Sequence, residues 1–390
     1  MSDCVLSNQN RFYVAAEPSF GSVPAITAAD RLAAIKLGIR QRSELRERRD
    51  KTGGRTYAGV APGGRNRTEF NLQTYLLTNP SPGTAPPAAK LVQAAMGAAA
   101  LSFGGSTAGA GSTTTQISFS GSHGLAEGQA FGFNGEIRFV KQVVSSSTVQ
   151  VNAPFSTAPA SGASLTPAVS YFPAAELPSV SIFDYWDPAN AVDRILVGAA
   201  CDRMTIKING DYHEFEFSGE AQDAIDNLTF EAGQGGLGSF PSEPAVTGNT
   251  TLPVPGNLGQ AWLGNTAGKF LTITSAEVEL NNDLDLRNRE FGTSAPQCIT
   301  AGVRRVLANF ELYEVDDTQS RDLYAAARAE TPVAVMFQLG EATGQLLGAY
   351  MKSVVPQLPE FEDDERILRW NFGNSRAQGE GDDELVVAFG

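Results

Sequence analysis

The clearest pattern in this chain is an alternation of apolar and polar residues that recurs along its length. A period of two places one set of side chains in a core and the other set outside, as in a half-buried β-strand. The alternating segments are Thr68–Thr74, Met204–Ile208, His213–Phe217 and Leu271–Thr274 with its continuation Glu277–Leu280. Each segment is therefore predicted to be a strand with one covered face.

Helical patterns are fewer and shorter. Residues 88–100 are rich in Ala and Leu, and within Ser320–Ala329 the apolar residues recur at helical spacing. Ser320 is the residue type that caps helix N-termini, so it is predicted to begin the second helix. The chain is predicted to be mainly β with a few short helices.

Two further segments interrupt these patterns. Residues 102–175 begin with a run of Gly, Ser and Thr, continue with short alternating stretches and end in a tract rich in Ser, Ala and Pro. This composition predicts a small β-module joined to the body by flexible leads. Residues 232–268 contain many Gly and several Pro, and they are predicted to form a long connecting loop.

Outside residues 102–175, the chain contains the same order of motifs twice. Ile35–Leu37 and Arg67–Tyr75 correspond to Val278–Leu280 and Arg305–Tyr313. The order continues with Lys90–Ala95 and Arg321–Ala326, Pro178–Phe183 and Pro332–Phe337, Leu196–Cys201 and Leu346–Met351, and Phe215–Gly219 and Trp370–Gly373. A shared order of this length indicates an internal duplication.

The duplication divides the chain into two similar domains. The first is predicted to comprise residues 1–101 and 176–231, with the β-module of residues 102–175 inserted into it. The second is predicted to comprise residues 269–390, after the connecting loop 232–268. The length of 390 residues, too great for one compact core, agrees with this division.

Charge is distributed unevenly along the chain. The formal net charge is −14, which disfavours a protein that coats nucleic acid by neutralising its phosphates. Residues 31–70, however, carry eleven basic and four acidic side chains, while the rest of the chain carries 18 basic and 39 acidic ones. Such asymmetry suits a protein whose copies associate through two different faces, although a solvated basic loop is the simpler interpretation.

Signatures of catalysis and of metal or cofactor binding are weak. The cysteines Cys4, Cys201 and Cys298 lie far apart, and the two histidines fit a packed strand (His213) and a turn (His123). Residues 233–238 match the spacing GxGxxG, but the Pro-containing sequence that follows cannot begin the helix that a dinucleotide site needs. Residues 281–285 alternate oxygen-bearing side chains without the Gly and Glu of a calcium loop. We expect no enzyme activity and no cofactor.

Targeting patterns are also lacking in the sequence. The N-terminal residues do not show the charged start and apolar run of a signal peptide, and the longest apolar run, about residues 91–101, is too short to span a bilayer. We therefore expect no membrane association and synthesis in the cytoplasm.

Several motifs resemble one protein family. The segment Phe12–Ala25, in which Glu17 precedes Phe20, Gly21 and Pro24, resembles the start of many tail tube proteins of long-tailed bacteriophages. Residues 37–55, with the motif Ser43-Glu44-Leu45-Arg46, resemble the next stretch of that family. The Leu125–Gly128 motif and the C-terminal order of strand, loop, strand, helix and strand are similar as well.

The resemblance implies two tandem β-sandwich domains, each with a short flanking helix. It also implies a structural virion protein, made in the host cytoplasm, whose rings stack into the tail tube and guide DNA into the host. Tape measure and tail terminator proteins are then the expected partners, and DNA passes without specific binding. A duplicated tube domain implies trimeric rings with pseudo-sixfold symmetry, with a hexamer as the second choice.

Two sets of residues are candidates for this role. The basic stacking segment comprises Arg42, Arg46, Arg48, Arg49, Arg55, Arg65 and Arg67. The lumen-facing candidates are Glu277, Glu279 and Asn281, which share one face of an alternating strand, and then Glu214 and Glu216. Carboxylates there would repel phosphates, although the same side chains on an outer surface are an equally simple interpretation.

A different class of function is also compatible with the sequence. A β-rich binding or adhesion protein could use the 102–175 module for recognition. Deletion of that module distinguishes the two functions, because a tube would still assemble and an adhesin would lose its ligand.

Overall fold

The computed structural model describes residues 4–43, 51, 53–57, 59, 64–187, 191–246, 251–264, 268–287, 290–363 and 366–390. Within these residues it contains two α-helices and many strands, of which 19 join in one sheet. The architecture is mainly β, as the alternating sequence patterns predict. Neither described helix is long and apolar enough to cross a membrane.

Two sets of elements, called unit 1 and unit 2, make up the body. Unit 1 contains β1 (Asn10–Ala16), β2 (Arg31–Leu32), β3 (Ala34–Ser43), β4 (Asn66–Tyr75), α1 (Ala89–Met96), β13 (Val180–Trp186), β14 (Arg194–Ile208), β15 (Glu214–Ala221) and β16 (Asp223–Asp226). Unit 2 contains β17 (Gly259–Leu263), β18 (Gly268–Phe270), β19 (Ile273–Asn281), β22 (Arg305–Tyr313), α2 (Thr318–Arg328), β23 (Val333–Leu339), β24 (Leu347–Val355), β25 (Glu360–Glu362), β26 (Arg369–Ala377) and β27 (Val386–Phe389). Short 3-10 segments lie at Ala28–Asp30 and Gln234–Gly236, and the β19–β22 connection carries the ribbon of β20 (Asp285–Leu286) and β21 (Ile299–Thr300).

The two units pair their strands in the same pattern. In unit 1 the order is β3, β4, β15, β14, and in unit 2 it is β19, β22, β26, β24. The first half of β14 leaves this layer to pair with β13 and β16, and β24 pairs in the same way with β23 and β27. β13 then pairs with β1, and β23 with β17. The repeated motifs of the sequence thus correspond to repeated topology.

The register of the repeat differs from the one read from the sequence. Phe70 of β4 lies opposite Ile39, and its counterpart Ala308 of β22 lies opposite Val278. Val278 therefore corresponds to Ile39, four residues beyond the predicted partner Ile35. A two-residue periodicity cannot distinguish registers that differ by an even number of residues, which explains the difference.

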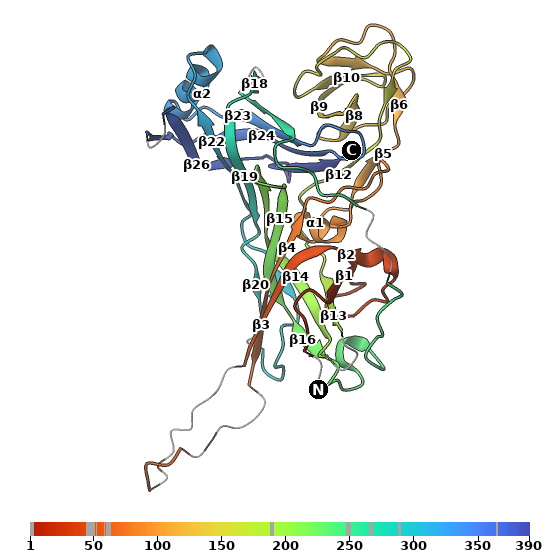
Figure 1. Cartoon of the computed structure of the whole chain (residues 1–390), viewed down its shortest axis with the longest axis vertical. Coiled ribbons are helices and arrows are strands. Elements are labelled where there is room, and N and C mark those ends of the chain that lie inside the picture. Colours follow the sequence, from red (N-terminus) through yellow and green to blue (C-terminus); the bar gives the residue numbers. More distant parts are fainter. Residues whose placement is uncertain are drawn as a thin grey trace.

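A single long sheet links the two units. β14 pairs with β19, so the strands run in the order β3, β4, β15, β14, β19, β22, β26 along the molecule. The predicted alternating segments fall on β4, β14, β15 and β19 of this sheet. Leu271 and Thr272, predicted to begin the last of them, precede β19, and Leu271 is exposed rather than covered. Figure 1 shows β3, β4, β14 and β15 running along the molecule, with the N-terminus at the end opposite to the C-terminus.

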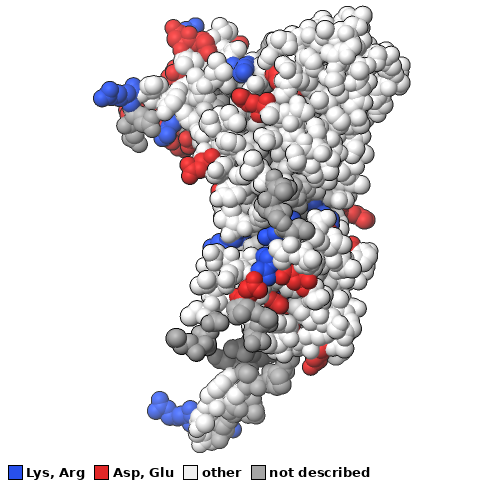
Figure 2. Space-filling model, turned by 45° about the vertical axis from the view of Figure 1, so that its right-hand side comes forward, with Lys and Arg blue, Asp and Glu red and all other residues white. Residues whose placement is uncertain are grey.

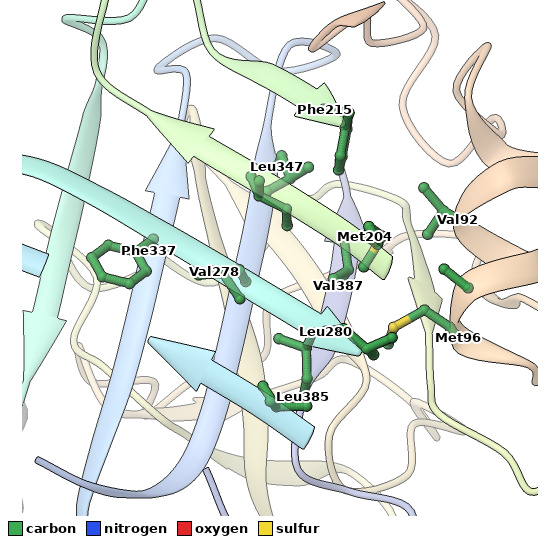
Figure 3. Packing of buried hydrophobic residues seen from close by; sticks show 14 of the residues in the cluster. Val92, Met96, Met204, Phe215, Val278, Leu280, Phe337, Leu347, Leu385 and Val387 are labelled. Atoms are coloured by element: carbon green, nitrogen blue, oxygen red, sulfur yellow. The ribbon is translucent and has the colours of Figure 1, made fainter. Parts of the chain in front are cut away.

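One face of the long sheet is covered by the main hydrophobic core. Leu72, Phe217, Met204, Leu280 and Phe310 are fully buried on this face. Helix α1 covers it where the units meet: Figure 3 shows Val92 and Met96 pointing toward Met204, Leu280 and Leu385. The opposite face carries the polar side chains of each strand, as the alternation requires.

The helices begin and end close to the predicted positions. α2 is capped by Asp317, whose carboxylate accepts a hydrogen bond from the Ser320 N–H (2.7 Å), so the predicted cap Ser320 lies inside the first turn. Asp317 is itself a preferred cap, so the sequence allowed both choices.

The insert between α1 and β13 is built from β5 (Leu101–Phe103), β6 (Ser106–Thr107), β7 (Gln116–Ser118), β8 (Ala130–Phe133), β9 (Glu136–Ser145), β10 (Thr148–Val151), β11 (Ser164–Leu165) and β12 (Ala168–Tyr171). β7 to β10 form a separate sheet over a core of their own, which includes Phe119, Phe131 and Phe155. The expectation of flexible leads is wrong. β5 and β12 pair with each other, and β12 also pairs with β27 of unit 2.

A buried arginine joins the insert to unit 2. Arg138 is fully buried and donates to Glu136 Oε1 (2.6 Å) and to Gln338 Oε1 of β23 (2.8 Å). Its guanidinium also lies 5.0 Å from the ring centroid of Trp262 in β17. The contact strand β17 lies inside residues 232–268, so that segment is not the uninterrupted loop expected from its Gly and Pro content.

Candidate functional site

The lumen-facing candidates come together on the polar face of the long sheet. β14 lies between β15 and β19, so Lys207 has Glu214 on one side and Glu277 on the other. In the same way Thr205 lies between Glu216 and Glu279. Glu277, Glu279, Asn281, Glu214 and Glu216 are therefore neighbours on one surface, although they come from two units.

Basic and amide side chains hold these carboxylates. Lys207 Nζ lies 2.7 Å from Glu216 Oε2, and Arg203 Nε lies 3.3 Å from Glu279 Oε1. The amide of Asn71 donates to Glu216 and that of Gln73 to Glu214, both at 2.7 Å. The hydrogen bond from Lys207 lowers the pKa of Glu216, and the same bond raises the pKa of Lys207.

The polar face is therefore mixed in charge rather than uniformly acidic. The strand registers also place basic side chains on it, namely Lys36, Arg40, Arg42, Arg67, Arg203, Lys207, Arg305, Arg369 and Arg376. Paired charges produce a weaker field at a distance than the row of carboxylates expected from the sequence. The face can contact a polyanion without holding it strongly and without uniform repulsion.

The basic segment begins at one end of this face. Arg42 lies opposite Arg67 across β3 and β4, and Arg67 forms ion pairs with Glu69 (3.3 Å) and Glu220. Arg65 donates to the backbone oxygen of Glu290 (3.4 Å), and Arg55 is exposed. Arg46, Arg48 and Arg49 lie outside the described residues. The described part of the segment is thus partly engaged in contacts within the chain.

The two ends of the long sheet are open strand edges. Among the described residues, β3 pairs with β4 only, so its other side carries unpaired backbone groups. At the far end, β26 is bordered by the three residues of β25 and by the tip of β24. Large exposed apolar side chains lie at both edges: Ile35 on β3 is 42% exposed and Phe361 on β25 is 54% exposed. Open edges of this kind are templates for pairing with another chain.

Glu17 has a structural role that was not predicted from the sequence. Its carboxylate accepts hydrogen bonds from the N–H groups of Gly21 (2.8 Å) and Gly198 (2.7 Å) and from the hydroxyls of Ser179 and Ser181 (both 2.6 Å). It therefore ties the N-terminal segment to β13 and β14. The Glu17 to Gly21 motif, noted only as a family resemblance, was the signal for this cluster.

The geometry of Gly21 explains the rest of that motif. Gly21 has a φ of +79°, and a Cβ there would lie 2.2 Å from the side chain of Gln222. Glycine is the residue that adopts this conformation without strain and leaves this space.

The remaining chemical candidates have structural roles. His213 is buried; its Nε2 donates to the Leu258 oxygen (3.0 Å) and its Nδ1 accepts from the Asn209 N–H (3.3 Å). Burial lowers the pKa of His213, so it is a neutral packed residue, as predicted. His123 accepts from the Leu125 N–H in its turn (2.9 Å). The Asn281 side chain accepts from the Asp283 N–H (2.9 Å), and the described residues contain no cluster of His, Cys, Asp and Glu that could hold a metal.

Comparison with models of protein families gives a match. A family model described as "Phage tail tube protein" matches residues 157–389, more than half of the chain. The matched region covers unit 2 and the strands β13 to β16 of unit 1. No curated protein matches the chain.

Proposed function

Since the chain belongs to the phage tail tube protein family, we propose that its copies close into rings and that these rings stack into a tube through which DNA leaves the virion. The protein is a structural component of the virion tail. A structural family supports a role without enzyme activity. The finer statements below concern how this chain assembles.

The observation that carries the proposal is the long sheet with two open edges and one polar face. A sheet of this kind removes its edges when neighbouring copies continue it until it closes on itself. The polar face then becomes the inner surface of the ring, because the other face is covered by the core. The edges differ in sequence, so the contact is heterologous, and a heterologous contact closes into a ring when its rotation allows.

The repeated topology supports a trimeric ring. We propose that units 1 and 2 are two copies of a tube domain, with the second beginning at β17 (Gly259) rather than at residue 269. Three chains would then supply six domains, and six chains are the alternative. The insert 102–175 extends from the first domain as an outer decoration.

Glu277, Glu279, Asn281, Glu214 and Glu216 are proposed to face the lumen. The mixed charge of the surrounding face suits DNA transit without retention, because the described part of this face interleaves basic and acidic side chains and offers no uninterrupted basic surface to successive phosphates. Tape measure and tail terminator proteins, implied by the family, are the proposed contacts of the lumen and of the tube end. We also propose that the protein belongs to a long-tailed phage and is made in the cytoplasm of the host cell.

The basic segment is proposed to make the contact between stacked rings. Reversal of charge at Arg46, Arg48 and Arg49 together is expected to block stacking and to leave single rings intact, because attraction between the faces becomes repulsion. Negative-stain electron microscopy measures the result, with tubes of the unchanged protein as the reference. Unchanged tube length in the triple variant would contradict the stacking role, and an unchanged protein that stays monomeric would contradict the function itself.

Excision of the insert distinguishes a tube decoration from a recognition domain. Thr107 lies opposite Ser164 across β6 and β11, so residues 108–163 can be replaced by Asn-Gly, which forms a two-residue hairpin turn. We expect the excised protein to form tubes like those of the unchanged protein. A folded protein that no longer forms rings would show that the insert takes part in assembly.

If the chain were instead a binding or adhesion protein that uses the insert for recognition, the surface of the insert would not favour a charged ligand. Residues 102–175 contain four charged side chains, Glu127, Glu136, Arg138 and Lys141, and two of these are buried. Figure 2 shows few charged side chains on the lobe at the upper right, where the insert lies. If the excised protein still forms tubes but no longer binds host cells, the insert has a recognition role and the rest of the chain forms the tube.

A further inference from the structure

We propose that β25 of one copy pairs with β3 of the next copy, in the same register in which β14 pairs with β19 within the chain. At the β14–β19 junction β14 is the basic strand and β19 the acidic strand. At the junction between copies the signs are the other way round, because β25 takes the place of β14 and is acidic, and β3 takes the place of β19 and is basic; this difference sets the order of units around the ring. This inference rests on the proposed self-assembly. It specifies, beyond that proposal, which residues pair between copies, in which register, and why other pairs of edges are unfavourable.

The internal junction is the template. There β14 supplies Arg203 and Lys207 to the polar face, and β19 supplies Glu277 and Glu279. Lys207 lies directly opposite Glu277, and Arg203 forms its ion pair with Glu279. The basic strand belongs to unit 1 and the acidic strand to unit 2.

Strand registers identify the equivalent residues at the outer edges. Ile206 of β14 pairs with Phe215, and Phe361 of β25 pairs with Trp370, the counterpart of Phe215 in unit 2. Phe361 therefore takes the place of Ile206. The place of Val278 is taken by Ile39, as the register of the repeat establishes.

The predicted contact follows from these equivalences. Ile206 lies opposite Val278 within the chain, so Phe361 lies opposite Ile39 of the next copy. Glu360 is then opposite Arg40, and Glu362 is opposite Gly38, between Lys36 and Arg40 on the same face. Directly opposite residues have Cβ atoms about 4.5–5.5 Å apart, within reach of an ion pair.

The polarity of this contact is opposite to that of the template. At the outer junction the strand from unit 2 is acidic, with Glu360 and Glu362, and the strand from unit 1 is basic, with Lys36 and Arg40. A β25 edge offered to a β19 edge would place carboxylates against carboxylates, and β14 against β3 would place cations against cations. Like charges directly opposite each other are destabilising, so only alternating units fit.

The two helices provide an independent argument for the same partner. α1 is covered from both sides: Leu91, Val92, Ala95 and Met96 are fully buried, the helix contacts β1, β13 and β14 of unit 1, and Asn282, which follows β19 of unit 2, donates to the Ala95 oxygen (2.9 Å). Its counterpart α2 buries only Ser320, Leu323 and Ala327 among its described residues. A hollow beside α2 is lined by Leu263, Phe270 and Val333. Unit 1 of the next copy would cover α2 as unit 2 covers α1.

Charge exchange tests the pairing. Glu360→Arg alone and Arg40→Glu alone are each expected to lower the fraction of chains in rings by about tenfold or more at equal concentration, because each places like charges opposite each other. The chain with both substitutions is expected to form rings again. Mixed with the unchanged protein under a different tag, it is expected to form separate rings. Glu231→Arg, at an exposed acidic residue outside both edges, is the matched control.

A cysteine pair tests the register. With Cys4 and Cys298 replaced by Ser, Glu360→Cys combined with Arg40→Cys is expected to form an interchain disulfide under mild oxidation. Glu360→Cys with Arg42→Cys, shifted by two residues, is expected to form much less, since diagonal Cβ atoms lie too far apart. This inference is overturned if rings still form with either single charge reversal, or if only the shifted cysteine pair forms a disulfide. Both results would be compatible with the proposed tube function. An unchanged protein that never forms rings overturns both the inference and that function.

Discussion

Replacement of Arg138 by alanine is expected to lower the free energy of unfolding by about 3–5 kcal/mol, the usual cost of removing one partner of a buried ion pair. Glu136 would keep its hydrogen bonds from the Ser156 N–H (2.8 Å) and Oγ (3.0 Å), but its charge would lose its counterion in a buried site. Burial lowers the pKa of Arg138 to about 10, so the guanidinium is still charged at neutral pH. The contacts of Arg138 with Gln338 and Trp262 of unit 2 would be lost with it.

Urea unfolding followed by tryptophan fluorescence is a suitable measurement, because Trp262 lies against the guanidinium. Arg321→Ala is the matched control, since the ion pair of Arg321 with Asp316 lies on the surface and is worth at most about 1 kcal/mol. The double variant Glu136→Gln with Arg138→Met is expected to recover much of the loss, because it leaves no unpaired charge. A stability loss below about 1 kcal/mol for Arg138→Ala would contradict a structural role of the ion pair.

Replacement of Glu17 by alanine is expected to cost about 2–4 kcal/mol, because two backbone N–H groups and two serine hydroxyls lose a charged acceptor. Glu17→Gln is expected to cost less, since the amide oxygen still accepts from part of this set. The effect is local to the N-terminal segment, so amide hydrogen exchange of Gly21 and Gly198 should rise before that of unit 2.

Glu231→Ala, at an exposed glutamate, is the control for the loss of a carboxylate. If Glu17→Ala unfolds at the same urea concentration as this control, the carboxylate does not organise the segment. Unfolding of a chain that contains two units and an insert is expected to show more than one transition, so the comparison uses the first transition.

The main elements of the fold were accessible from local patterns. Alternation predicted the strands on β4, β14, β15 and β19, an Ala- and Leu-rich composition predicted α1, and helical spacing predicted α2. These patterns show which face of a helix or strand is buried, and residues close together in the sequence are enough to show it. The cap of α2 was misplaced by three residues, because Asp317 and Ser320 are both capable caps.

The candidate site was accessible only in part. The shared face of Glu277, Glu279 and Asn281 follows from one strand, but the neighbours Glu216 and Lys207 come together through pairing with β14 and β15. The expected acidic surface is for this reason a mixed one. No local signal indicated that cations from other strands would alternate with the carboxylates.

The amino-acid pattern alone established the strands, the duplicated order of motifs and the uneven charge, because each is a property of nearby residues or of a repeated order. The register of the repeat, the docking of the insert through Arg138 and the pairing of charges on the polar face depended on contacts between residues far apart in the chain. Such contacts are selected by the packing of whole sheets, and a period of two leaves several registers equally compatible with the same sequence. The three-dimensional arrangement therefore also decided which strands, β3 and β25, remain at the open edges.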